Sequence, residues 1–363
     1  MLGDEADCPH CGKSTRLFDP NAEEAPAPRT GLRFKEADSG TPGGGGSGQA
    51  AVIADQIIEN VEKVVVGKRR QIELTLVALF ADGHALLEDV PGVAKTMLAR
   101  ALAQSVGGRF KRVQCTPDLL PNDITGASIF NPKTTEFEFR AGPLFANIVL
   151  ADEINRATPR AQSALLEAMA ERQVSVDGTI HQLERPFFLI ATQNPVDHEG
   201  TFPLPEAQLD RFTIRLSLGY PSAAEESAMI ERLQLGHPIE TLSPVVNAAD
   251  VVRCQEAVRQ VQVHERVRNY IVQLIRATRE HEAIILGGSP RSTLALTRAA
   301  QAQAAIAGNS HVMPDDVKLV APAVLPHRLI VKPESRLRKI TSENIVTEVL
   351  RSVKVPLMPD HLG

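Results

Sequence analysis

The residues with the clearest chemistry lie in the segment 85–98, ALLEDVPGVAKTML. Lys95 and Thr96 fit the end of the pattern GxxxxGK[ST], whose backbone N–H groups surround phosphates while the Lys binds β- and γ-oxygens and the hydroxyl binds Mg²⁺. Asp89 and Ala94 stand where this pattern has glycine, and a left-handed backbone at Ala94 would cost on the order of 1 to 2 kcal/mol. The segment predicts a phosphate-binding loop that departs from the pattern at both glycines.

The neighbouring sequence supplies the strand and the helix that such a loop needs. Residues 85–87 form a short apolar run, and apolar residues recur at helical spacing from Met97 to Val106. Gly107 and Gly108 are typical of a helix end. The alternative is an ordinary strand, loop and helix with a surface lysine.

A second segment with chemistry is NIVLADEINRA, where an apolar run leads directly into Asp152 and Glu153. Ligands of open α/β sheets bind at the carboxyl ends of the strands. There Asp152 could hold Mg²⁺ through its water shell, and Glu153 could take a proton from an attacking water. The alternative is a solvated pair that caps the next helix, although Thr158 and Pro159 already fit the first positions of that helix.

A third apolar run, LIATQNP, ends at Asn194. An amide at the same sheet edge could orient a water beside a γ-phosphate. Asn-Pro is also a common turn, so this segment alone is weak evidence for a site. It supports the site because it would be the third strand to end at the same edge of the sheet.

Two arginines could complete such a site. Arg211 precedes the strand-like FTIRLSL, and its alternative role is a local ion pair with Asp210. Arg291 follows Ser289 and Pro290, which fit the N-cap and first position of a helix. A cation in the first turn opposes the helix dipole by a few tenths of a kcal/mol or more, so the placement is easier to explain if an anion binds there.

Composition bounds the class of protein. The chain has 363 residues, 43% hydrophobic and 23% charged, which is ordinary for a globular protein large enough for two domains. A net charge of -5 gives no electrostatic reason to expect nucleic acid. No apolar run approaches the roughly 20 residues that span a bilayer, and the N-terminus lacks a signal-peptide core, so we expect a cytoplasmic protein. Four cysteines are too few for a disulfide framework.

Residues 1–50 form an N-terminal extension that we expect to be disordered. It contains CPHCG and the Gly-rich run SGTPGGGGSGQA, which is typical of a flexible linker. Cys8 and Cys11 have the spacing of half a zinc ribbon and could hold Zn²⁺ with ligands from elsewhere. The alternative is an exposed, unpaired CxxC.

The remaining chain predicts two domains and a short tail at 356–363. Residues 51–219 begin with two amphipathic helices broken near Gly67 and then alternate strands and helices, which predicts a parallel sheet covered on both faces. Five strands are expected, at 86–88, 110–115, 147–151, 187–192 and 212–218. Residues 220–355 predict an all-helical domain, with helices near 222–236, 247–261, 264–281, 290–308 and 314–325 and one more in the tail. Two hairpins, TTEFEFRAG and VSVDGTI, are inserted in the first domain. They could be insertions without a function, moving parts or contact surfaces.

With these motifs in this order, residues 51–355 resemble the MoxR family of AAA+ ATPases. The segments that carry the resemblance are LLEDVPGVAKT, LADEINRA, ATQNP, EGTFPLPEAQLDRF and GGSPR. The family often has Ala at the position of Ala94 and tolerates Asp at that of Asp89. The resemblance implies a P-loop α/β core with a helical lid, which usually assembles as a hexameric ring with ATP between subunits.

The resemblance also implies roles for individual residues. The phosphate loop that binds ATP would comprise Pro91, Gly92, Val93, Ala94, Lys95, Thr96 and Met97. Thr96 and Asp152 would hold Mg²⁺, Glu153 would activate water, and Asn194 would be sensor 1. Arg211 looks like the arginine finger that reaches the neighbouring subunit. Arg291 looks like sensor 2, which couples γ-phosphate loss to lid movement. Gly67 looks like part of the segment beside the adenine. Relatives are thought to act as chaperone-like factors on protein clients, often beside a von Willebrand factor A domain partner.

Two other functions compete with ATP-driven remodelling. Asp89 and Ala94 favour a scaffold that responds to nucleotide with little hydrolysis. A DNA-remodelling AAA+ motor is the third hypothesis, and the acidic chain without an appended nucleic-acid module argues against it.

Overall fold

The computed structural model describes residues 5–7, 14–16, 46–195, 200–234 and 236–358. The chain divides into two units, residues 1–43 and 44–363. In the first unit, β1 (Glu5–Asp7) pairs antiparallel with β2 (Ser14–Arg16). Cys8 and Cys11 lie outside the described residues, so the zinc prediction stays a prediction.

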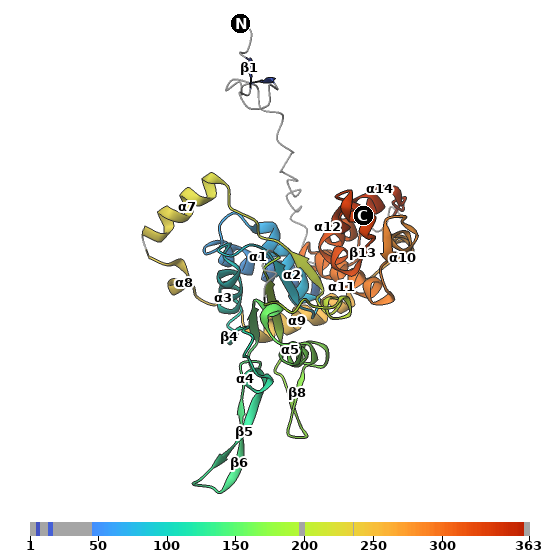
Figure 1. The fold of residues 1–363 in the computed structure, drawn as a ribbon. Helices are drawn as coiled ribbons and strands as arrows, with labels where there is room; N and C mark the ends of the chain where they lie inside the picture. The colour runs from blue at the N-terminus through green and yellow to red at the C-terminus, as the bar shows by residue number, and fades with distance from the viewer. Residues whose placement is uncertain (1–4, 8–13, 17–45, 196–199, 235, 359–363) are drawn as a thin grey trace. The chain divides into compact units, whose positions relative to one another are not determined.

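A five-stranded parallel sheet forms the centre of the second unit (Figure 1). Its strands in chain order are β3 (Ala85–Glu88), β4 (Phe110–Gln114), β7 (Ile148–Asp152), β10 (Phe188–Gln193) and β11 (Ile214–Leu216). In space the order is β11-β3-β10-β7-β4, and every neighbouring pair is parallel. The predicted five-stranded α/β core is confirmed.

Both faces of the sheet are buried because alternate strand residues enter two different cores. Leu87 and Leu150 join a core with the first three helices, whereas Leu86 and Val149 join a second core with α4 and α5. The helices of this part are α1 (Gly46–Glu62), α2 (Arg69–Phe80), α3 (Lys95–Ser105), α4 (Pro121–Thr125), α5 (Pro159–Glu171) and α6 (Glu206–Leu209). Helix α1 begins earlier than the expected boundary at 51, since Ala50 already packs in the core.

Helices follow the sheet, as predicted for the lid. They are α7 (Ala223–Gln234), α8 (Pro238–Thr241), α9 (Ala248–Gln260), α10 (Glu265–Glu280), α11 (Pro290–Ile306), α12 (Pro314–Val324), α13 (Pro333–Leu337) and α14 (Ser342–Ser352). The lid also contains β12 (Ile284–Leu286) paired antiparallel with β13 (Ile330–Val331). The expectation that no strand follows residue 220 was therefore wrong, because strands of two or three residues leave no readable alternation.

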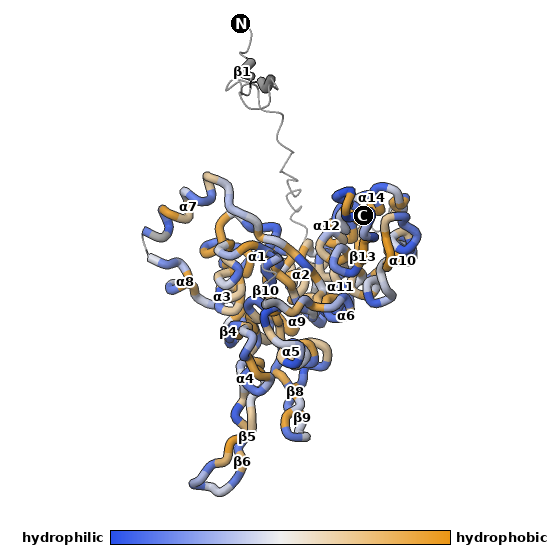
Figure 2. The backbone as a smooth tube through the Cα atoms, viewed as in Figure 1, coloured by the Kyte–Doolittle hydropathy of each residue, from blue (hydrophilic) through white to orange (hydrophobic). Residues whose placement is uncertain are grey.

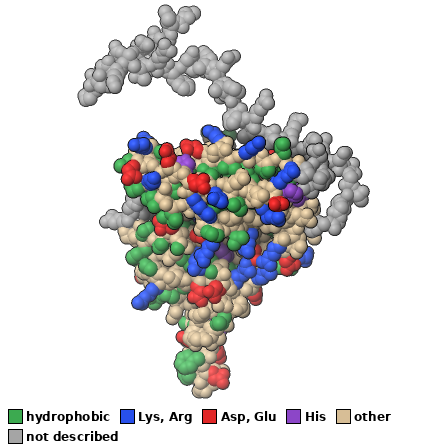
Figure 3. Space-filling model, turned by 90° about the vertical axis from the view of Figure 1, so that its right-hand side faces the viewer, with side chains coloured by type: hydrophobic (Ala, Val, Ile, Leu, Met, Phe, Trp, Pro, Cys, Tyr) green, Lys and Arg blue, Asp and Glu red, His purple; other side chains and the backbone are tan. Residues whose placement is uncertain are grey.

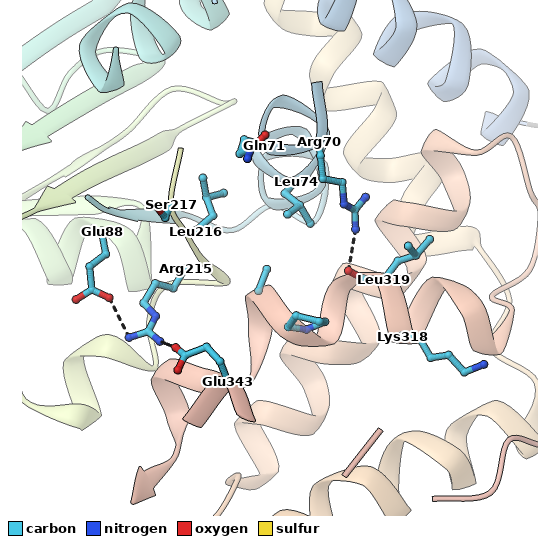
Figure 4. A pocket seen from close by; sticks show the side chains of 12 residues that line it. Arg70, Gln71, Leu74, Glu88, Arg215, Leu216, Ser217, Lys318, Leu319 and Glu343 are labelled. Atoms are coloured by element: carbon cyan, nitrogen blue, oxygen red, sulfur yellow. Dashed lines mark hydrogen bonds and ion pairs between the residues drawn. The ribbon is translucent and has the colours of Figure 1, made fainter. Parts of the chain in front are cut away.

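The lid packs on the core around a cavity of about 560 Å³ (Figure 4). At this seam Arg215 of β11 pairs with Glu88 of β3 at 3.0 Å and with Glu343 of α14. Arg70 of α2 donates to the Leu319 carbonyl of α12 at 2.8 Å. Through Arg215, ion pairs thus connect Glu88, the last residue before the phosphate loop, to Glu343 of the lid.

Two antiparallel hairpins extend from the α5 side of the core, as predicted (Figure 1). They are β5 (Gly126–Asn131) with β6 (Glu136–Ala141), and β8 (Gln173–Val176) with β9 (Thr179–Gln182). Positive φ angles at Asp177 and Gly178 confirm the expected turn. Figure 2 shows apolar residues along the longer hairpin, and Figure 3 shows hydrophobic side chains near its tip. Within the described ranges, no helix is long and apolar enough to cross a membrane.

Candidate nucleotide-binding site

The predicted phosphate loop joins β3 to α3 with the expected backbone. Ala94 has φ 62° and ψ 20°, so the left-handed conformation falls on Ala where the pattern has glycine. Its methyl group cannot cap a helix, and no side chain caps the first turn of α3, which begins at Lys95. Gly92 has φ +87°, and no atom lies within 4 Å of the position of an added Cβ. The first turn of α3 thus has no side-chain cap and there is open space beside Gly92, which leaves room for an anion at this helix start.

Lys95 is held against the loop. Its Nζ donates to the Asp89 carbonyl at 2.7 Å. Burial lowers the pKa of Lys95 below its ordinary value, while the carboxylates of Asp89, Asp152 and Glu153 oppose that shift. A partly desolvated ammonium with a single carbonyl acceptor is well placed to exchange that acceptor for phosphate oxygens.

Thr192 joins the two predicted acidic residues at the adjacent strand ends. Its hydroxyl donates to Asp152 Oδ1 at 2.6 Å and accepts the backbone N–H of Glu153 at 2.8 Å. Glu153 has a left-handed backbone, with φ 58° and ψ 50°. Thr158 is the N-cap of α5 and Pro159 its first residue, so the acidic pair does not cap that helix. The hydroxyl thus orients one carboxylate and the backbone of the other.

Arg112 is a site residue that sequence reasoning missed. Its guanidinium donates to Asp152 Oδ2 through Nε at 3.0 Å and Nη2 at 2.5 Å. Gln114, also on β4, donates to Glu153 at 3.2 Å, and Arg156 pairs with Glu153 at 3.0 Å. The signal was the alternation of FKRVQ, which directs Arg112 and Gln114 to the same face of β4. Only the structure shows that Gln114 lies opposite Asp152 in the pairing of β4 with β7, and this pairing is what brings that face to the acidic pair.

Three strand ends meet at one sheet edge, as the sequence predicted. Gln193 of β10 lies opposite Glu88 of β3, and the Asp89 N–H donates to the Gln193 carbonyl at 3.1 Å. Asn194 follows directly and is 9% exposed. Gln193 Oε1 is buried without a hydrogen-bond partner in the described part of the chain, so an acceptor stands ready for a donor. Lys95, Asp152 and Asn194 therefore lie at the same edge.

Gly67 lies in the turn between α1 and α2, with a left-handed backbone that favours glycine. Its φ is +71°, and an added Cβ would lie 1.6 Å from Glu225 Oε1. Next to it, Lys68 Nζ donates to the Tyr220 carbonyl at 3.0 Å. The segment that leads into the lid thus covers the turn predicted to flank adenine.

The two predicted arginines lie together, away from the phosphate loop. They share a pocket of about 280 Å³ with three further arginines, Arg172, Arg298 and Arg328. Arg211 donates to the Leu166 carbonyl at 2.7 Å, and Asp210 pairs with Arg328, so the alternative ion pair of Arg211 with Asp210 is wrong.

This arginine pocket includes Gly83 and His84, which precede β3, whereas the phosphate loop follows β3. Four strand residues at about 3.3 Å each separate the two ends by roughly 13 Å. The structure therefore does not bring Arg211 or Arg291 to the phosphate loop of the same chain. Figure 3 shows Lys and Arg side chains interspersed with Asp and Glu side chains on the face turned to the viewer.

The residues at the phosphate-loop edge fit a nucleoside triphosphate with Mg²⁺. The uncapped N–H groups of α3 and the Lys95 ammonium are donors for phosphate oxygens, and the open space beside Gly92 leaves room for them. Thr96 and Asp152 could supply the oxygen ligands that Mg²⁺ prefers, and Asp152 Oδ2 accepts from Arg112 in this structure. In the described ranges, no group of three His, Cys, Asp or Glu side chains is placed to hold a metal ion.

Comparisons with known proteins agree with this geometry. The family described as "ATPase family associated with various cellular activities (AAA)" matches residues 84–214, and an AAA lid domain matches residues 276–349. The uncharacterized protein YeaC of Bacillus subtilis is 53% identical, over 84% of this chain and 95% of the relative. Chaperone MoxR1 of Mycobacterium tuberculosis is 41% identical, over 87% of this chain and 86% of the relative.

A solved structure extends the agreement to three dimensions. A Cytophaga hutchinsonii protein described as a candidate ATPase superposes with a TM-score of 0.80 at 37% identity, covering 86% of this chain and 97% of that one. The two chains thus share their fold along most of their length. This chain belongs to the MoxR family of AAA+ ATPases.

Proposed function

We propose that the chain is a Mg²⁺-dependent ATP hydrolase that drives chaperone-like remodelling or maturation of protein clients. The observation that carries the proposal is the convergence of Lys95, Asp152, Glu153 and Asn194 at one edge of the sheet. The relative named chaperone MoxR1 supports the chaperone-like part. The protein would work in the cytoplasm, where ATP is supplied.

Each residue at this edge has a distinct task. Lys95 exchanges the Asp89 carbonyl for phosphate oxygens. Thr96 and Asp152 would hold Mg²⁺, which neutralises charge on the β- and γ-phosphates. Glu153 accepts the proton of an attacking water that the Asn194 amide orients. Thr192 keeps Asp152 and Glu153 in register while this happens.

The arginine pocket supports a site shared between subunits. Arg211 and Arg291 lie at the amino end of β3, so they can act on a nucleotide only when another copy presents it. A homo-oligomer, which we propose to be a hexameric ring, places this pocket against the phosphate-loop edge of the next subunit. Arginine fingers contribute roughly 10³ to 10⁵ in rate. Arg291 would then report γ-phosphate loss in one subunit to the lid of its neighbour, and a von Willebrand factor A domain protein is the partner expected beside the ring.

Glu153→Gln tests the catalytic assignment. The amide keeps the size of the side chain but cannot take a proton, so we expect ATP binding to persist while turnover falls by about 10² or more. Phosphate release, measured at concentrations that permit assembly, gives turnover, and calorimetry gives binding. Glu184→Gln is the matched control, because Glu184 is an exposed carboxylate paired with Arg109 away from the site. Unchanged turnover in Glu153→Gln would remove Glu153 from the mechanism.

The same assay separates the competing functions. A scaffold would bind ATP without releasing phosphate, and a DNA motor would release phosphate faster when duplex DNA is added. We expect the protein to release phosphate, at a rate that duplex DNA does not change.

A further inference from the structure

Asp89 holds the first position of the phosphate loop, where the pattern has glycine, and it is 7% exposed. Its Oδ2 accepts hydrogen bonds from Ser217 Oγ at 2.9 Å and from the backbone N–H groups of Leu218 and Gly219, both at 2.7 Å. Its Oδ1 accepts the N–H of Val90 at 2.9 Å. A buried carboxylate is stable only when its oxygens are paired in this way. All four donors belong to the loop or to residues 217–219.

These bonds redirect the chain after β11. The strand ends at Leu216, and the N–H groups of Leu218 and Gly219 bond to Asp89 rather than to a neighbouring strand. Figure 4 shows Ser217 directly after Arg215 and Leu216, at the border with the lid. Tyr220 follows, and its carbonyl accepts Lys68 Nζ beside Gly67. One carboxylate thus connects the phosphate loop to the segment that covers the turn predicted to flank adenine.

We propose that Asp89 is a positioning residue for nucleotide binding, which fixes the phosphate loop and residues 217–219 as one unit before the nucleotide arrives. This inference rests on the proposed function. A loop ordered in advance spares the nucleotide the cost of ordering it, so loss of the carboxylate weakens binding. The carboxylate does not touch the reacting atoms, so its loss changes the binding of substrate and transition state alike. Such a change raises KM and leaves kcat nearly unchanged.

Two substitutions isolate the carboxylate. Asp89→Gly restores the residue of the general pattern, removes all four hydrogen bonds and keeps the backbone carbonyl that Lys95 uses. Asp89→Asn keeps the size of the side chain, but its NH₂ group cannot accept, so either the Val90 N–H or the three donors from 217–219 lose their acceptor. Glycine at this position is expected to bind nucleotide less well than aspartate, opposite to what the motif suggests.

Calorimetric titration with ADP and Mg²⁺, which involves no turnover, measures the effect. We expect both variants to bind ADP about tenfold or more weakly, with kcat for ATP reduced by less than about threefold. Hydrogen exchange of residues 214–221 without nucleotide should be faster in Asp89→Gly, because the Leu218 and Gly219 N–H groups lose their acceptor. Asp316→Asn is the matched control, since Asp316 is 6% exposed and accepts the Met313 N–H at 2.8 Å in the lid. That variant should bind ADP as the wild type does.

The outcomes separate this inference from the proposed function. If Asp89→Gly folds and binds ADP as tightly as the wild type, the positioning role is overturned. If Asp89→Gly does not fold, Asp89→Asn decides by the same measurement. A fall in kcat with unchanged KM would also overturn it. A wild-type protein that binds neither ADP nor ATP would instead overturn the proposed function, and this inference with it.

Discussion

At the scale of single residues, Thr192 is the side chain on which both acidic groups depend. Its hydroxyl joins Asp152 to the backbone of Glu153, and the residue is fully buried. Glu153 also needs support because its left-handed backbone is unfavourable for a residue with a Cβ. Thr192, which precedes Gln193 and Asn194, therefore supports both acidic residues of the site.

Thr192→Val should remove that support with almost no change in shape. The Glu153 N–H and Asp152 Oδ1 lose their partner, which we expect to lower the free energy of unfolding by about 1 to 3 kcal/mol. Turnover should fall roughly 10- to 100-fold, as for residues that orient metal ligands. Phosphate release and urea unfolding measure the two effects. Thr75→Val, a buried threonine that bonds its own helix, should lose stability only, and equal turnover loss in both would contradict the assignment.

His84 predicts a dependence of stability on pH. Its Nδ1 accepts the Leu189 N–H at 3.0 Å, and its Nε2 lies 3.1 Å from the Met169 carbonyl, so the neutral ring satisfies both partners. Burial lowers the pKa of His84 from 6.5 to about 4, and the nearby Arg172 adds to that shift. Between these values the unfolded chain binds a proton that the folded chain does not, so stability falls as the pH falls from 6.5 to 4.

The expected loss is about 3 kcal/mol across that window, at 1.36 kcal/mol per pKa unit. Urea unfolding at several pH values measures it. His84→Gln keeps a donor and an acceptor but does not titrate, so its slope against pH should be smaller than that of the wild type. Identical slopes would show that His84 is not the group responsible.

The sequence predicted the residues at the phosphate-loop edge better than the side chains that position them. Lys95, Asp152 and Asn194 could be found because they belong to short motifs at the ends of apolar runs. Arg112 and the Asp89 carboxylate could not, because their partners lie 40 and more than 120 residues away in the chain. Only the strand order brings such groups together.

At the scale of elements, the longer hairpin separates into an anchored base and an exposed tip. At the base, Phe139 stacks on His181 of the other hairpin with ring centroids 3.8 Å apart. At the tip, Phe130 and Phe137 contact each other at 5.5 Å while 47% and 74% exposed. The base holds the hairpins together, and the tip makes no contribution to the core.

Replacing both tip residues, Phe130→Ser with Phe137→Ser, should change the free energy of unfolding by no more than about 0.5 kcal/mol each. Basal ATP turnover should be unchanged because the tip is outside the nucleotide site. Phe139→Ser is the comparison, and it should lower stability by removing the stacked contact. Thermal unfolding and phosphate release check both, and loss of turnover in the tip variant would make the hairpin part of the catalytic unit.

Element boundaries were predictable wherever local pattern determined them. Helices near 247–261 and 290–308 were found because their apolar periodicity and caps agree with the structure. Strand β11 was predicted too long, since apolar Leu218 continues its pattern while its N–H bonds Asp89 instead. A hydrogen bond to a distant side chain ended the strand, and no local signal reports that.

At the scale of the whole assembly, the charges are divided between two edges of the sheet. One edge holds Lys95 and the acidic pair, and the other holds the arginine pocket with Arg211 and Arg291. A single chain cannot bring the two edges together across β3. We therefore propose that assembly between copies completes the catalytic site.

Mixing two inactive variants tests that claim most directly. Arg211→Ala keeps Glu153, and Glu153→Gln keeps Arg211, so at equal mixing about a quarter of the interfaces would contain both intact residues. We expect each variant alone to release little phosphate and the co-assembled mixture to release clearly more than either. If native mass spectrometry shows mixed assemblies while phosphate release stays at the level of the separate variants, the site is not shared between subunits.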